Sequence, residues 1–126
     1  MSLTKEEKRV ALSLGSLGDE DIKDFPNNID KKDWFIISIS QDLSEEFIEK
    51  YKNDVLWDCI SAFQDLSEEF IEKHKDKLDW NWISIYQKLS EEFIEKYKNK
   101  VSWYYISKHQ KLSDNFIEKY RNYLNK

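Results

Sequence analysis

The sequence predicts an all-α fold, namely a solenoid of short helix pairs with a 23-residue repeat. The segment LSEEFIEK occurs unchanged at 43–50, 66–73 and 89–96, so successive copies follow one another without gaps. The 126 residues include only two Gly and one Pro, which argues against a turn-rich β fold. The chain is 36% charged, but it is also 15% aromatic, and disordered chains contain few aromatic residues.

We expect residues 1–126 to form a single domain. Residues 1–32 are predicted to be an irregular N-terminal cap, in which LGDEDIKDF at 17–25 resembles a decayed first half of a copy. Residues 33–126 contain the tandem helical repeats. They begin with the second half of a copy and end with a partial fourth copy, LSDNFIEKYRNYLNK. Terminal units of repeat proteins are commonly atypical because they cover the ends of the stack.

Each full copy is predicted to begin with a short helix. In the first copy, Ser44 precedes two Glu residues and can cap the free N–H groups, and the acids favour the positive end of the helix dipole. The apolar residues that follow have helical spacing, so we expect one buried stripe. The members of this stripe are Phe47, Ile48, Tyr51 and Val55. The later capping positions are Ser67, Ser90 and Ser113.

The second helix of each copy is predicted to begin at a Trp. Capping residues precede it at Asp33, Asp79 and Ser102, and Leu56 is the exception. The Trp and the residues three, four and seven places later form one helix face, which reads Trp, Ile, Ser, Gln. The small Ser allows a close neighbouring helix, and the Gln can hydrogen-bond the turn to the next copy. We expect a core position for Trp34, Trp57, Trp80 and Trp103.

The repeat pattern LSEEFIEKYKxxVxWxxISxxQK resembles the short tandem repeats of mostly uncharacterised proteins from giant DNA viruses, phages and some bacteria. The resemblance covers residues 33–126 well and the first 32 residues poorly. It implies a helical repeat fold and indicates no particular reaction or cofactor. Leu56 in place of a polar residue and His74 in place of Tyr are minor departures from the pattern.

No pattern in the sequence indicates catalysis, so we expect a non-enzymatic protein without a cofactor or a metal. Gly15 and Gly18 do not form a nucleotide-binding loop. Cys59 is the only cysteine, which excludes an internal disulfide and a cysteine zinc site. His74 and His109 occupy positions that are aromatic in other copies. The repeated Glu residues suit helix caps and solvated faces better than a catalytic pair, which needs no repetition.

The start of the chain does not resemble a signal peptide, because charged residues precede only a short and mildly apolar run. No segment approaches the ~18 apolar residues of a membrane span. We therefore expect a cytoplasmic protein with no membrane partner.

Positions that vary between copies are the candidate binding residues, because constant positions serve stacking and varying positions are free to serve a ligand. The varying columns, meaning the residues at one position of successive copies, lie on the second helix and are rich in aromatic residues. This pattern favours a protein partner, and the resemblance suggests a protein of a host cell. Packing between copies is an equal interpretation for the column that contains Trp82. The predicted partner-binding residues are Asp58, Asn81, Trp82, Tyr86, Tyr104, Tyr105 and Lys108.

The charge distribution supports an alternative in which the partner is nucleic acid. The net charge is −5, but residues 1–85 carry 11 basic and 20 acidic side chains, and residues 86–126 carry 9 and 5. The basic C-terminal copies could bind phosphates, or the acidic N-terminal half could mimic DNA. The candidate contacts are Lys98, Lys100, Lys108, Lys111 and Arg121 together with Tyr104 and Tyr105.

Overall fold

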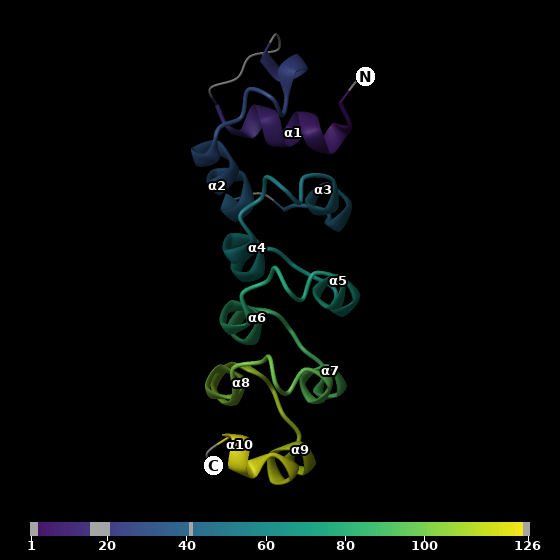
Figure 1. Cartoon of the computed structure of the whole chain (residues 1–126), viewed down its shortest axis with the longest axis vertical. Helices are drawn as coiled ribbons and strands as arrows, with labels where there is room; N and C mark the ends of the chain where they lie inside the picture. The colour runs from purple at the N-terminus through teal and green to yellow at the C-terminus, as the bar shows by residue number, and fades with distance from the viewer. Residues whose placement is uncertain (1–2, 16–20, 41, 125–126) are drawn as a thin grey trace. The chain divides into compact units, whose positions relative to one another are not determined.

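The computed structural model describes residues 3–15, 21–40 and 42–124, and every regular element in these ranges is a helix (Figure 1). The predicted all-α class, with short helix pairs that recur every 23 residues, is confirmed. The chain divides into two compact units, Met1–Gln64 and Asp65–Lys126. Within the ranges described, no helix combines the length and the apolar character needed to cross a membrane.

The described residues of the first unit form the 3-10 helix η1 and the α-helices α1 to α4. Helices α2 and α4 pack directly against each other. They are both second helices of the repeat, so the pairs stack through equivalent elements. The bounds are α1 Lys5–Ser13, η1 Asp21–Asp24, α2 Lys31–Ser40, α3 Glu45–Lys50 and α4 Trp57–Phe63.

In the second unit, residues 65–124 form successive helix pairs, α5 with α6, α7 with α8 and α9 with α10. Helix α8 packs against α6 and against α10. Figure 1 shows α6, α8 and α10 along one side of this unit and α5, α7 and α9 along the other. The bounds are α5 Glu68–Lys73, α6 Trp80–Tyr86, α7 Glu91–Lys96, α8 Trp103–His109, α9 Asp114–Lys119 and α10 Arg121–Leu124.

The first helix of each copy is capped as predicted but is shorter than its apolar stripe. Each capping Ser accepts a hydrogen bond from the backbone N–H of the Phe three residues later, at 3.0–3.2 Å. Helix α3 ends at Lys50, whereas the stripe extends to Val55. The backbone N–H of Val55 donates to the carbonyl of Tyr51 at 3.0 Å, so the following turn still directs Val55 into the core.

The second helices begin at the Trp in three copies. Asp79 accepts from two backbone N–H groups of α6 and Ser102 accepts from one in α8, while Leu56 provides no side-chain cap. These three observations confirm the predicted caps at Asp79 and Ser102 and the predicted exception at Leu56.

Helix α2 corrects the prediction that Asp33 caps a helix starting at Trp34. It begins at Lys31 instead. The reason is local, because Asp30 Oδ1 accepts from the backbone N–H of Asp33 at 2.8 Å and caps an additional turn. Asp33 thus lies inside the first turn of the helix.

The constant Ser and Gln residues connect successive copies. In the second unit, Gln110 Oε1 accepts from the N–H of Leu89 at 3.2 Å, and its Nε2 donates to the carbonyl of Ser84 at 2.8 Å. The Gln therefore joins the start of its own copy to the second helix of the preceding copy, and not to the turn that leads to the next copy. The Gln110 side chain can bind both the Leu89 N–H and the Ser84 carbonyl because Gln110 is the C-cap residue of α8. The corresponding bonds of the first unit join Gln64 to Leu43 and Ser38.

The repeated Trp residues pack between copies as expected, but only Trp34 is buried, and Trp57, Trp80 and Trp103 are half-buried. The ring of Trp80 is stacked on Phe93, with centroids 6.2 Å apart, and lies 5.4 Å from Tyr97. Its indole N–H donates to the carbonyl of Lys75 at 2.9 Å. Trp103 makes equivalent contacts, and the Ile three residues after each Trp is fully buried.

The N-terminal segment contains regular structure that the sequence prediction did not include. Thr4 and Glu7 form a capping box at the start of α1, with hydrogen bonds of 2.9 and 3.1 Å. The predicted decayed half-copy at 17–25 lies partly outside the described residues, and its described part includes η1. Phe25 follows η1, is buried, and packs its ring 6.1 Å from that of Trp34.

Candidate functional site

The outer side of α6 and α8 carries six of the seven predicted partner-binding residues. The two helices pack against each other and bury Ile83, Ser84 and Ile106. The variable positions point away from these buried residues. Of the six, Tyr105 is half-buried and the other five are exposed. We define the α6–α8 face as Asn81, Trp82, Tyr86, Tyr104, Tyr105 and Lys108.

Helix α6 contributes an aromatic pair to this face. Trp82 and Tyr86 are one helical turn apart, which places their side chains on the same surface. Their rings are stacked, with centroids 5.7 Å apart and an interplanar angle of 24°. The exposed fraction is 39% for Trp82 and 58% for Tyr86. A large rigid apolar surface therefore remains open to solvent.

Helix α8 combines aromatic rings with a cation. The rings of Tyr104 and Tyr105 meet edge to face at 5.1 Å, and Tyr105 lies 6.2 Å from the ring of His109. Lys108 Nζ lies 4.9 Å from the centroid of the Tyr104 ring, within the range of a cation–π contact. Tyr104 is nevertheless 61% exposed. This helix thus presents both apolar surface and positive charge.

Trp82 differs from the repeated Trp residues in the hydrogen bonding of its indole N–H. The indole N–H groups of Trp57, Trp80 and Trp103 each donate to a backbone carbonyl at 2.9 Å. Among the described residues, no acceptor lies within hydrogen-bond distance of Trp82 Nε1. The repeated indoles are satisfied inside the stack, whereas that of Trp82 is available to water or a partner.

Asp58, the seventh predicted residue, lies on α4 in the first unit and is exposed. Every member of its column is exposed: Phe35, Asp58, Asn81 and Tyr104. The Trp82 column is mixed, because Cys59 and Tyr105 are half-buried and Trp82 is exposed. Burial and, to a smaller extent, the charge of Asp58 raise the pKa of the Cys59 thiol, which disfavours the thiolate that a nucleophile requires.

The acids of the second unit do more than cap helices, because they link the first helices of successive copies. Glu68 accepts from the backbone N–H of Ser90 at 2.6 Å and from its hydroxyl at 2.9 Å. Glu72 accepts from Lys96 Nζ at 2.6 Å and from the Tyr97 hydroxyl at 2.7 Å. We call this arrangement the Glu ladder. Its next step joins Glu91 to Ser113, and Glu95 to Lys119 and Tyr120.

The ladder shifts the ionisation of its members. Hydrogen bonds from Lys96 and Tyr97 lower the pKa of Glu72, and those from the next copy do the same for Glu95. The hydrogen bond to Glu95, together with partial desolvation, raises the pKa of Tyr120 to about 12. These shifts follow from structural contacts between copies and do not indicate a catalytic acid or base.

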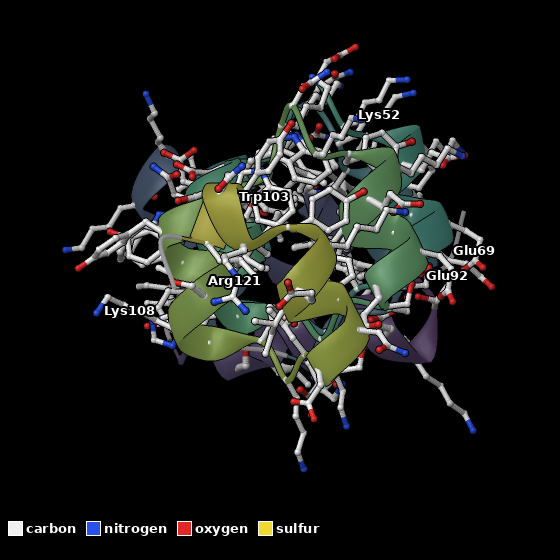
Figure 2. All side chains as sticks on the ribbon, turned by 90° about the horizontal axis from the view of Figure 1, so that it is seen from below. Lys52, Glu69, Glu92, Trp103, Lys108 and Arg121 are labelled. Atoms are coloured by element: carbon white, nitrogen blue, oxygen red, sulfur yellow. The ribbon has the colours of Figure 1, made fainter. Side chains whose placement is uncertain are left out.

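Two surface hollows of about 370 and 320 Å³ lie along the Glu ladder. Figure 2 shows Glu69 and Glu92 projecting on this side of the unit and Lys108 on the opposite side. Most polar groups around the hollows are engaged by the Ser, Lys and Tyr contacts of the ladder. The larger hollow is lined by Glu68, Glu69, Glu72, Ser90, Glu92, Phe93 and Lys96.

In the first unit the same contacts are made by α1, which is not a copy of the repeat. Glu6 accepts from the backbone N–H of Ser44 at 2.7 Å and from its hydroxyl at 2.5 Å. Glu7 is buried and accepts from Lys50 Nζ at 2.6 Å and from the Tyr51 hydroxyl. Sequence reasoning missed these acids. The available signal was the capping box formed by Thr4 and Glu7.

Burial opposes ionisation of Glu7, but its hydrogen bonds outweigh this effect. Lys50, Tyr51 and the backbone N–H of Thr4 all donate to it, and together they lower its pKa to about 2. Burial and the hydrogen bond to Glu7 raise the pKa of Tyr51. Glu7 is therefore a structural carboxylate that is held ionised.

The basic residues of the nucleic-acid alternative do not form one free surface. Lys100 Nζ pairs with Asp76 at 3.6 Å, and Arg121 pairs with Glu118. Lys108 lies over Tyr104, as described above. Lys98 and Lys111 are exposed. Internal acids thus offset two of the five predicted phosphate contacts.

Histidine and metal chemistry have no visible basis in the described part of the chain. His74 is buried and its ring lies 4.6 Å from that of Phe70, which fits an aromatic substitution for Tyr. Within residues 3–15, 21–40 and 42–124, no group of three or more His, Cys, Asp or Glu side chains is arranged to hold a metal ion.

Comparison with known proteins adds no family to this description. No protein-family model matches the chain. No curated protein and no solved structure matches it either. The site is therefore interpreted from its own residues.

Proposed function

We propose that this chain is a non-enzymatic helical-repeat module that binds another protein through the α6–α8 face. The supporting observation is that constant and varying positions of the second helices have different surroundings. Residues that are constant between copies are buried or hydrogen-bonded in the stack, whereas most of the varying residues of the α6–α8 face are exposed and four of its six residues are aromatic. Exposed aromatic side chains in one patch are a common mark of a protein-binding surface.

The composition of the face supports a protein partner. Trp and Tyr dominate the binding energy of many interfaces because they bury large areas with few rotatable bonds. Trp82, Tyr86 and Tyr104 fit this role, since each is large, exposed and held by a neighbouring side chain. The offset of the basic residues by Asp76 and Glu118 makes a phosphate backbone a weaker candidate.

The biological setting of this proposal rests on the resemblance of the repeat. Similar tandem repeats occur in viral and phage proteins, so the proposed partner is a protein of the host cell and the proposed compartment is the cytoplasm. This part of the proposal is independent of the geometry of the face.

The test is capture of partners by the tagged full chain from lysate of the native or host cell. One half of the lysate is treated with nuclease, and bound proteins are identified by mass spectrometry. The variant Trp82→Ala/Tyr104→Ala removes the two aromatic anchors of the face. Leu12→Ala serves as the matched control, because Leu12 is also an exposed apolar residue but lies on α1 in the other unit.

A partner that survives nuclease, binds the Leu12→Ala variant and is lost with the double variant supports the proposal. Circular dichroism must show that the double variant keeps its helix content. Equal capture by the double variant would place the binding surface elsewhere. Loss of all capture after nuclease would make nucleic acid the partner.

A further inference from the structure

The α6–α8 face is positively charged as well as aromatic. Helices α6 and α8 read WNWISIY and WYYISKH, so neither contains an Asp or a Glu. Lys108 and His109 end α8, and exposed Lys residues follow the C-caps of both helices at Lys88 and Lys111. The face and the C-terminal ends of its two helices therefore carry three exposed Lys residues, Lys88, Lys108 and Lys111, and the two helices contain no carboxylate.

The cations are not required by the fold. Basic residues at helix C-termini can serve only to balance the helix dipole. Helix α4 argues against that explanation, because it ends in Ala62 and Phe63 and the residue after its C-cap is Asp65. Its C-cap nevertheless forms the same hydrogen bond to the Ile carbonyl as in α6 and α8. The change from acidic to basic residues is thus free to serve a partner.

The face also offers hydrogen-bond donors that the described residues leave unused. Trp82 Nε1 and the hydroxyl groups of Tyr104 and Tyr105 have no hydrogen-bond partner in the part of the chain that the structure describes. Indole N–H groups only donate, and phenol hydroxyls donate well to carboxylates. Donors and cations around an apolar surface are complementary to carboxylates that alternate with apolar side chains.

These observations, together with the proposed function, lead to a chemical class of partner. We propose that the α6–α8 face binds an acidic segment of another protein, in which Asp or Glu residues are interspersed with apolar ones. Carboxylates of the segment pair with Lys108 and accept from Trp82 Nε1 and the Tyr104 hydroxyl. Apolar side chains of the segment cover the Trp82–Tyr86 pair and the open face of the Tyr104 ring.

A nucleic-acid strand fits the same face less well. Sequence-tolerant binding of single strands combines stacking on aromatic rings with a continuous basic track. One face of the Tyr104 ring is covered by Lys108, and one face of Trp82 by Tyr86. Lys100 and Arg121, which could extend the track, are paired with acids. A short acidic segment requires only the few cations that are present.

The test is fluorescence anisotropy with the purified full chain and three labelled probes. Two are peptides of equal length in which Phe and Leu alternate with Glu in one and with Lys in the other. The third is oligothymidylate of comparable length. Binding is measured at low and physiological ionic strength for the wild type, Lys108→Glu and Lys98→Glu. Lys98→Glu is the matched control, because it makes the same charge change at an exposed Lys on the turn that precedes α8.

We expect the Glu peptide to bind and the Lys peptide not to bind. Lys108→Glu should weaken the affinity for the Glu peptide about tenfold, whereas Lys98→Glu should leave this affinity nearly unchanged. Salt should weaken the wild-type complex more than the Lys108→Glu complex. Circular dichroism confirms that both variants are folded.

Three results would overturn the inference: no binding of the Glu peptide, binding of the Lys peptide at least as tightly, or tighter binding of oligothymidylate. Equal effects of the two charge reversals would also contradict it, because the contact would then be a general charge effect. Failure here is distinguishable from failure of the proposed function. A protein captured through Trp82 and Tyr104 would still show the face to be an interface, with a partner of different charge.

Discussion

The two units contain the same hydrogen-bonded contact of a Glu with a Lys and a Tyr, but the Glu is buried to a different extent in each. In the first unit, Glu7 binds Lys50 and Tyr51, and in the second, Glu72 binds the equivalent Lys and Tyr. The side chain of Glu7 is 3% exposed, whereas that of Glu72 is 45% exposed. The contact of a Glu with Lys and Tyr lies at the surface between copies of the repeat. It is buried where the helix α1, which is not a copy of the repeat, supplies the Glu.

The aromatic stack shows a related contrast between Trp34 and the repeated Trp residues of the later copies. Trp34 of the first unit is 4% exposed and has Phe25, Phe47 and Tyr51 around it. Trp103 of the second unit makes similar ring contacts but is only half-buried. Phe25, which is not part of the repeat, adds to the cover of Trp34, whereas Trp57 of the same unit is half-buried like Trp103. Burial, and not the identity of the contact, should therefore set the energetic cost of losing each residue.

The largest expected effect is that of Trp34→Ala. Removing a fully buried Trp should lower the free energy of unfolding by about 4 kcal/mol. Trp103→Ala should cost clearly less, because part of its ring already faces water. Urea unfolding followed by circular dichroism compares the two variants. Equal losses would show that depth in the stack is not what matters.

The next effect concerns the carboxylates. Glu7→Gln should destabilise the chain by about 2 to 3 kcal/mol, because it breaks a buried charged contact with Lys50 and Tyr51. Glu72→Gln is the matched control in the second unit, and its effect should be much smaller since water replaces the lost contact. The comparison between units fails if Glu72→Gln proves as harmful as Glu7→Gln.

The pH dependence sharpens the same comparison. The folded-state pKa of Glu7 is about 2, below its usual value of 4.5, so its ionised form stabilises the fold. This contribution should be fully present above about pH 4.5 and should disappear as the pH falls towards about 2. Thermal unfolding over this range should give a steep loss of stability for the wild type and a shallower one for Glu7→Gln. Parallel profiles would assign the acid sensitivity to other groups.

The smallest expected loss of stability is that of the buried Ser residues in the second helices, and it should be equal in both units. Ser38 Oγ and Ser84 Oγ each donate to the carbonyl of the preceding Trp and accept a backbone N–H from the next copy. Replacing either Ser by Ala should cost about 1 kcal/mol, because one backbone N–H loses its partner. Unfolding measurements on Ser38→Ala and Ser84→Ala test this expectation. A marked difference between them would mean that the copies are less equivalent than their bonds indicate.

Local features of this protein could be predicted from the sequence with good accuracy. The Ser caps, the buried Phe and Ile of the first helices and the Trp at the start of most second helices depend on residues within one turn of each other. The exposure of Asp58 and Asn81 was also predictable, because residues that alternate in size and charge between copies do not suit a repeated core. The extra turn of α2 was missed, since Asp30 lies outside the repeat and its capping bond competes with that of Asp33.

The sequence by itself determined the helix pairs, their 23-residue period and the side of each helix that is buried, because these depend on helical periodicity and capping. Only the tertiary structure decided which Glu residues join copies, that α1 supplies Glu6 and Glu7, and that Gln110 bonds backward to Ser84. These bonds join residues that lie 22 to 44 positions apart in the sequence, so they form only because the copies stack and bring the residues together. The same physical reason applies to Trp82, since its exposure depends on how neighbouring helices pack and not on its place in the repeat.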